Sequence, residues 1–83
     1  MAKSQSFKQP VRIQLGRIDR DRIVLGVKDA AEILLREWPA AVDTARHVKA
    51  MEACLEVIRG TKPPSYARRH FVAACKEAKV LLE

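Results

Sequence analysis

Two short stretches near the start of the chain alternate between apolar and polar residues. Residues 10–15 (PVRIQL) have this period of two, and so do residues 22–27 (RIVLGV). Such a period is typical of a β-strand with one solvent-exposed face. In the second stretch the larger apolar residues, Ile23, Leu25 and Val27, predict the buried face. The short connector (residues 16–21) predicts an antiparallel hairpin whose apolar face is covered by helices.

The next segment predicts a helix from Asp29 to Trp38. Asp29 and Glu32 have the spacing of a capping box, which marks the start of a helix. Pro39 predicts its end, because the residue before a proline is displaced from the α region. One side of this helix carries apolar residues, namely Ala30, Ile33, Leu34 and Trp38. We expect Trp38, the only tryptophan, to fill the corner between this helix and the next one.

A second helix is predicted to end at Arg59, since Gly60 is a typical C-terminal cap. Asp43 or Thr44 is suited to cap its N-terminus. Cys54 lies beside the residues that we expect to be buried. These are the larger apolar residues, spaced three and four apart: Val48, Met51, Leu55 and Ile58.

The third helix is predicted from Ser65 to Val80, after a proline-containing connector. Its expected buried residues are Ala67, Phe71, Ala74 and Ala78. Residues 80–82 either finish this helix or form a short third strand, and the sequence leaves both open. The predicted fold class is therefore α+β, an antiparallel β-hairpin packed against three α-helices. The predicted core contains Trp38, Leu34, Leu55, Met51 and Phe71.

The length of 83 residues predicts a single domain. We place it at residues 10–83, and we expect residues 1–9, polar apart from Phe7, to form a flexible N-terminal tail. The sequence shows no signal peptide and no apolar run near the ~20 residues that cross a bilayer. Its two cysteines do not form the framework of a disulfide-rich secreted protein. We therefore expect a cytoplasmic protein with reduced thiols.

Several short motifs occur in an order that resembles a known family. In chain order they are Trp38-Pro39, Ala50 with Cys54, Gly60, and Ala67-Arg68 followed by Phe71. With this order and spacing the chain, from about Pro10 to Leu82, resembles the small bacterial proteins of domain-of-unknown-function family 982. The resemblance implies an α+β fold and a small stand-alone protein. That family has no established activity, so the resemblance assigns no catalytic residue.

One position departs from the family pattern. The pattern includes a glycine shortly after Trp-Pro, where this chain has Ala41, Val42 and Asp43.

Basic residues give the sharpest functional signal. Sixteen Lys and Arg against ten Asp and Glu give a net charge of +6, which attracts polyanions and also favours solubility. Lys62, Arg69 and Lys76 recur every seven residues, with Tyr66 between the first two. These four residues are the candidate polyanion-binding site, and a solvated outer face is the favoured alternative. Arg17, Arg20 and Arg22 at the hairpin tip are a further candidate, largely neutralised by Asp19 and Asp21.

Two more residues are candidates for structural or partner contacts. Arg68 follows Ala67 and precedes Phe71, so we expect it to bridge to a neighbouring helix end or to an acidic side chain, and a structural ion pair is favoured over ligand binding. Trp38 is the other candidate.

Catalytic and metal-binding residues are not expected. The two cysteines and two histidines lack the spacing of a zinc site, so we expect both cysteines to be small buried residues and predict no metal or cofactor. No phosphate loop or nucleophile motif is present.

These observations favour a non-enzymatic interaction module that forms homodimers or binds another protein. The alternative is a nucleic-acid-binding accessory protein that uses the basic residues of the third helix.

Overall fold

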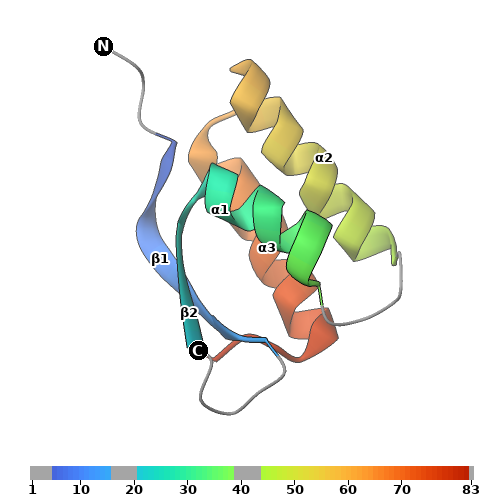
Figure 1. Ribbon diagram of the computed structural model, residues 1–83. Coiled ribbons are helices and arrows are strands. Elements are labelled where there is room, and N and C mark those ends of the chain that lie inside the picture. The colour runs from blue at the N-terminus through green and yellow to red at the C-terminus, as the bar shows by residue number, and fades with distance from the viewer. Residues whose placement is uncertain (1–4, 16–20, 39–43, 83) are drawn as a thin grey trace.

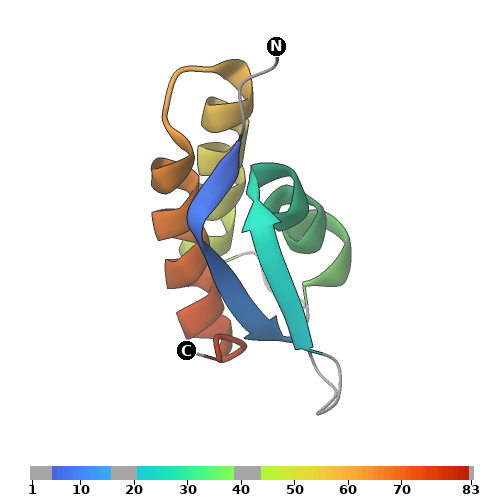
Figure 2. The same ribbon diagram turned by 90° about the vertical axis from the view of Figure 1, so that its left-hand side faces the viewer.

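The computed structural model describes residues 5–15, 21–38 and 44–82. Within these ranges a β-hairpin is followed by helices (Figure 1). The elements are β1 (Ser6–Gln14), β2 (Asp21–Gly26), α1 (Val27–Glu32), the π-helix η1 (Ile33–Glu37), α2 (Ala45–Arg59) and α3 (Pro64–Ala78). The hairpin forms one layer and the helices form the other (Figure 2). Since η1 directly continues α1, the predicted α+β fold with a hairpin and three helices is confirmed.

The two strands pair in antiparallel fashion, with an irregularity in β1. Ser6 lies opposite Gly26 and Val11 lies opposite Val24, so that residues 7–10 of β1 face Leu25 alone. This bulge contains Pro10, which has no N–H group to donate to a partner strand. β1 thus begins before Pro10 and includes residues 6–9 of the expected tail, and Phe7 is buried.

The predicted buried face of β2 is wrong. Val24 is fully buried, whereas Ile23 and Leu25 are 59% and 55% exposed. The cause is the register, because Val24 lies opposite Val11 and both point toward the helices. Neighbouring residues of a strand point to opposite faces, so the two larger residues face outward. Val27 is buried as predicted, but as the first residue of α1.

The chain after α3 returns to the sheet. Leu81 forms an isolated antiparallel bridge with Ile13 of β1. The amide of Gln14 donates to the carbonyl of Val80 at 2.8 Å, and the amide of Leu82 donates to the carbonyl of Arg12 at 3.0 Å. Of the two possibilities left open, residues 80–82 therefore do not finish the helix; they pair with β1 through one isolated bridge, and the described sheet has two strands.

The first helical segment begins earlier than the capping box predicted. α1 starts at Val27 after Gly26, and no side chain caps it. The amide of Val27 instead donates to the carbonyl of Gln5 at 3.0 Å, because β2 runs directly into the helix. The predicted end is confirmed, since Trp38 has an extended backbone after η1.

Both predicted ends of α2 are confirmed. The Thr44 hydroxyl accepts a hydrogen bond from the amide of His47 at 3.1 Å, and Asp43 lies outside the described residues. At the other end Gly60 has φ 91°, a left-handed conformation that glycine adopts without steric cost. The short connector to α3 places the two helices side by side and antiparallel (Figure 1).

Candidate interaction surfaces

The inner face of α2 consists of small residues. Its buried positions are Ala50, Ala53, Cys54 and Val57. α3 presents similarly small buried residues, Ala67, Ala74 and Cys75, around the larger Phe71. Small side chains allow two helices to approach closely, and these residues follow the spacing of a helix face. The interior of the helical layer is therefore closely packed.

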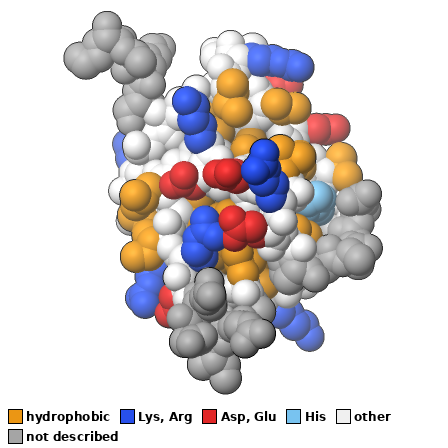
Figure 3. Space-filling view, viewed as in Figure 1, with side chains coloured by type: hydrophobic (Ala, Val, Ile, Leu, Met, Phe, Trp, Pro, Cys, Tyr) orange, Lys and Arg blue, Asp and Glu red, His pale blue; other side chains and the backbone are white. Residues whose placement is uncertain are grey.

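The outer face of α2 carries the larger apolar residues. We use this term for Val48, Met51, Leu55 and Ile58. The exposed fractions of Val48, Leu55 and Ile58 are 43%, 47% and 44%, and Met51 is partly buried against the core. The prediction that this set faces the core is therefore wrong for these three residues, because α2 buries its small residues against α3. Figure 3 shows hydrophobic side chains along the upper right of the molecule, where α2 runs.

Charged residues of both signs border the outer face of α2. Glu52 and Arg59 lie three and four positions from Leu55 and therefore on the same side of the helix, whereas Lys49 is close to His70 of α3. The carboxylate and the cation beside the apolar set balance one another, although the whole chain carries +6. The apolar set is therefore bordered by a locally neutral rim.

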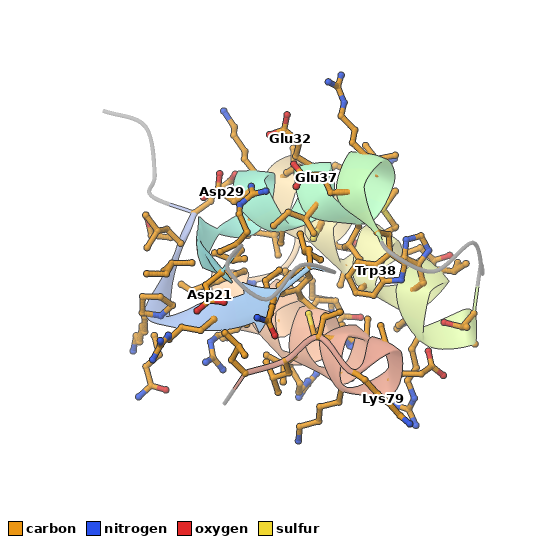
Figure 4. The ribbon with its side chains drawn as sticks, turned by 60° about the horizontal axis from the view of Figure 1, so that its bottom comes forward. Asp21, Asp29, Glu32, Glu37, Trp38 and Lys79 are labelled. Atoms are coloured by element: carbon orange, nitrogen blue, oxygen red, sulfur yellow. The ribbon has the colours of Figure 1, made fainter. Side chains whose placement is uncertain are left out.

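Trp38 fills the corner between η1 and α2, as the sequence predicts (Figure 4). Its ring lies 5.4 Å from the His47 ring and 6.5 Å from the Phe71 ring. His47 Nε2 is 2.9 Å from the carbonyl oxygen of Leu34. A carbonyl only accepts, so Nε2 is the donor. In a π-helix this oxygen would accept from residue 39, but Pro39 has no N–H, and His47 supplies the bond instead.

Three of the four candidate polyanion-binding residues lie together at the start of α3. Lys62 precedes the helix, and its Nζ is 5.0 Å from the centre of the Tyr66 ring. The guanidinium carbon of Arg69 is 5.6 Å from the same ring. Both are cation–π contacts, which hold the two cations beside one aromatic side chain. The structure thus brings Lys62, Tyr66 and Arg69 into contact.

His70 lies beside this cluster. Its ring is 4.8 Å from the Tyr66 ring in an edge-to-face arrangement. Burial and the neighbouring charges of Arg69 and Lys49 lower the pKa of His70 below its ordinary value. The local surface is therefore electropositive.

Lys76, the fourth candidate, lies further along α3 in an open groove of about 780 Å³. We call this feature the α3 groove. Its lining residues are Arg46, Ser65, Arg68, Arg69, Val72, Ala73, Lys76 and Glu77. Arg69 joins the groove to the Tyr66 cluster. The sequence analysis missed Arg46, because no spacing along the chain relates a residue of α2 to α3.

Glu77 is the one carboxylate among the described residues that line the groove. It accepts a hydrogen bond from the hydroxyl of Thr44 at 2.6 Å, and its other oxygen is 3.8 Å from Nε of Arg46. Thr44 is the N-cap of α2, so Glu77 connects the two helices at that end. Its charge is thereby placed near the positive end of the α2 dipole.

Arg68 makes no ion pair with a carboxylate among the described residues, in contrast to the expectation from the sequence. Its Nε donates to the carbonyl oxygen of Gln9 at 2.7 Å. Gln9 lies in the bulge of β1, where the regular pairing between the strands is interrupted. A backbone carbonyl at such a bulge needs a donor from elsewhere, and Arg68 provides it. Arg68 therefore has a structural role, but its partner is a backbone carbonyl and not a carboxylate.

The remaining basic candidates are at the hairpin tip. Arg17 and Arg20 lie outside the described residues, as do Ala41, Val42 and Asp43. Arg22 forms an ion pair with Glu37 at the end of η1. This pair links the hairpin to the first helical segment.

Both cysteines are buried and free, as predicted. Burial raises the pKa of Cys54 to about 11 and that of Cys75 to about 12. Within residues 5–15, 21–38 and 44–82, no three His, Cys, Asp or Glu side chains are grouped as a metal site would require.

The family is decided by comparison with known proteins. A family model described as "Protein of unknown function (DUF982)" matches residues 9–82. The chain belongs to this family. The resemblance derived from the sequence motifs is thus confirmed. No curated protein matches the chain significantly.

A solved structure shows the same fold in a relative. An NMR structure of an Agrobacterium tumefaciens protein is 36% identical in sequence and superposes with a TM-score of 0.76. The match covers 94% of this chain and 76% of the other. As for membrane association, each helix in the described part of this DUF982 chain is too short or too polar to span a bilayer.

Proposed function

We propose that this protein is a non-enzymatic interaction module of the cytoplasm that self-associates through the outer face of α2. The observation that supports this is the exposure of Val48, Leu55 and Ile58 on one helix face. A protein of this size gains stability by covering such residues. The two free cysteines suit a reducing compartment.

The spacing of the outer face favours a second copy of the chain as its partner. Its residues are three, four and three positions apart, and this spacing reads the same in both directions. In this arrangement two antiparallel copies of α2 pack through their outer faces, and the two-fold axis crosses these faces at the height of residue 53. Val48 would then lie beside Ile58, and Met51 beside Leu55. A two-fold contact uses the same patch on both copies, and this pattern satisfies that requirement.

Opposed helix dipoles favour the same antiparallel arrangement, because the positive end of each α2 then lies beside the negative end of the other.

Sedimentation equilibrium of the full chain over a wide concentration range tests the proposal. The wild type is expected to form a dimer. Leu55→Glu is expected to raise the dimer dissociation constant at least roughly tenfold, because each dimer would bury two unpaired carboxylates.

Leu35→Glu is the matched control, because Leu35 is 68% exposed but lies on η1 and is not part of the outer face of α2. It is expected to leave the dissociation constant unchanged. A wild-type protein that stays monomeric at every concentration would overturn the proposal and indicate a different protein as the partner. An equal effect of both substitutions would show that the outer face is not the contact.

A further inference from the structure

The α3 groove combines an apolar floor with a basic rim. Val72 and Ala73 are partly buried at its base. Four cations and one carboxylate line the groove: Arg46, Arg68, Arg69 and Lys76, with Glu77. The carboxylate is engaged by Thr44 and lies near Arg46. The groove therefore has an excess of positive charge.

Two of these cations are available to a ligand. Arg69 and Lys76 are both exposed, and neither forms an ion pair with a described carboxylate. Arg68 uses Nε for Gln9, and the groove lining still includes its side chain. A solvated cation without a carboxylate partner keeps its full attraction for an external anion.

The acidic residues of the first helical segment lie elsewhere. Figure 4 shows Asp29, Glu32 and Glu37 along α1 and η1, on the opposite side of the view from Lys79 at the end of α3. Residues 62–79 contain five cations and one carboxylate, whereas residues 27–37 contain two cations and three carboxylates, so the charge is unevenly distributed. Uneven charge of this kind orients a polyanion toward one face.

We propose that the α3 groove binds the phosphate backbone of nucleic acid without reading its base sequence. Arg69 and Lys76 are seven residues apart, or ~10 Å along the helix at ~1.5 Å per residue. That distance corresponds to about three steps of ~3.4 Å along one strand of a duplex. Three of the four groove cations are arginines, and the planar guanidinium group matches phosphate oxygens in pairs.

The lining of the groove suits contacts with the backbone. Most of its polar side chains are cations, and its described residues include no aromatic side chain on which a base could stack. Tyr66 is outside this lining, and its ring contacts Lys62 and Arg69. The proposed contacts are electrostatic and are made to phosphates, which carry no sequence information. This inference does not depend on self-association through α2.

Fluorescence anisotropy tests the inference with labelled oligonucleotides of two unrelated sequences, each as duplex and as single strand. The full-length protein is titrated at low and near-physiological salt. Binding is expected to be independent of sequence and to weaken linearly in a log–log plot against salt. The better-bound form identifies whether duplex or single-stranded backbone fits the groove.

Two double variants distinguish binding in the groove from attraction by the overall charge. Arg69→Gln with Lys76→Gln is expected to lower the affinity by about tenfold or more and to reduce the salt slope by about two. The control is Lys28→Gln with Arg36→Gln, which removes the same charge from α1 and η1, where both residues are exposed. It is expected to change affinity and slope only slightly.

Three results would overturn the inference. An equal loss in both double variants would mean that only net charge matters. Absence of binding at near-physiological salt would leave the groove as a solvated surface. Competition by polyglutamate as strong as that by unlabelled oligonucleotide would indicate an acidic protein as the ligand.

Discussion

α2 and α3 are similar helices with different outer surfaces. Each has 15 residues, ends in a left-handed residue and packs small residues against the other helix. Their solvent-facing sides differ, because α2 exposes Val48, Leu55 and Ile58 whereas α3 lines a groove with Arg68, Arg69 and Lys76. The shared inner faces account for the fold, and the different outer faces account for the two proposed interactions.

This comparison separates residues that stabilise the fold from residues that serve binding. In α2 the inner residues are smaller than the outer ones, which is the reverse of the usual relation between size and burial. Close approach to α3 requires that reversal. Substitutions on the inner side of α2 should therefore change the stability of the fold, and substitutions on the outer side should change association.

The largest expected effect is on the inner face. Ala53→Leu adds volume where only 1% of the residue is exposed, so it should lower the free energy of unfolding by about 1–3 kcal/mol. Ala45→Leu adds the same atoms at the exposed first residue of α2 and should change the free energy of unfolding by less than about 0.5 kcal/mol. Urea denaturation measures both. Equal stability of the two variants would contradict the assignment of Ala53 to the packed side.

The second effect is at the end of α2. Gly60→Ala should lower the free energy of unfolding by about 1–2 kcal/mol, because alanine is disfavoured at φ 91°. Nothing lies within 4 Å of a Cβ at this position, so the cost comes from the backbone alone. Gly60→Asn tolerates the left-handed region better and should lose less. Thermal unfolding would give the order of stability of the wild type and the two variants. An alanine variant as stable as the wild type would contradict the prediction.

The smallest effect, at the end of α3, should have the opposite sign. Lys79 has φ 61° although it is not a glycine, so Lys79→Gly should raise the free energy of unfolding by less than about 1 kcal/mol. Lys79→Ala removes the same charge and keeps the backbone strain, so it should bring no gain. Chemical denaturation of the pair distinguishes strain from charge. An equal gain in both variants would assign the effect to charge.

Features with a local cause could be predicted from the sequence. Thr44 and Gly60 were assigned correctly because a cap depends on a few neighbouring residues. Trp38 ends its helix because of the adjacent Pro39. The burial of Phe71 and Leu34 followed from clear helical spacing.

Features that depend on tertiary contacts could not be predicted. α2 has two sets of apolar residues with helical spacing, and periodicity alone favoured the larger set, which includes Leu55. In β2 the bulge and the pairing with Val11 determine the buried face, whereas the pattern in the sequence predicted burial of Ile23 and Leu25. The capping box did not mark the helix start because β2 runs directly into α1, where the amide of Val27 donates to the Gln5 carbonyl.

The candidate site was partly predictable for the same reason. Lys62, Tyr66 and Arg69 are close in the chain, and the structure brings their side chains into contact, as their spacing indicates. Arg46 joins the groove only because α2 packs against α3. The bond from Arg68 to Gln9 spans 59 positions of the sequence, and no local pattern indicates it.

The buried cysteines give a direct view of motion between the helices. Cys54 lies on the inner face of α2 and Cys75 on that of α3, and burial keeps both in the thiol form at neutral pH. A thiol must reach solvent and ionise before it can be alkylated. The rate at which an alkylating reagent labels the native protein therefore measures how often α2 and α3 separate.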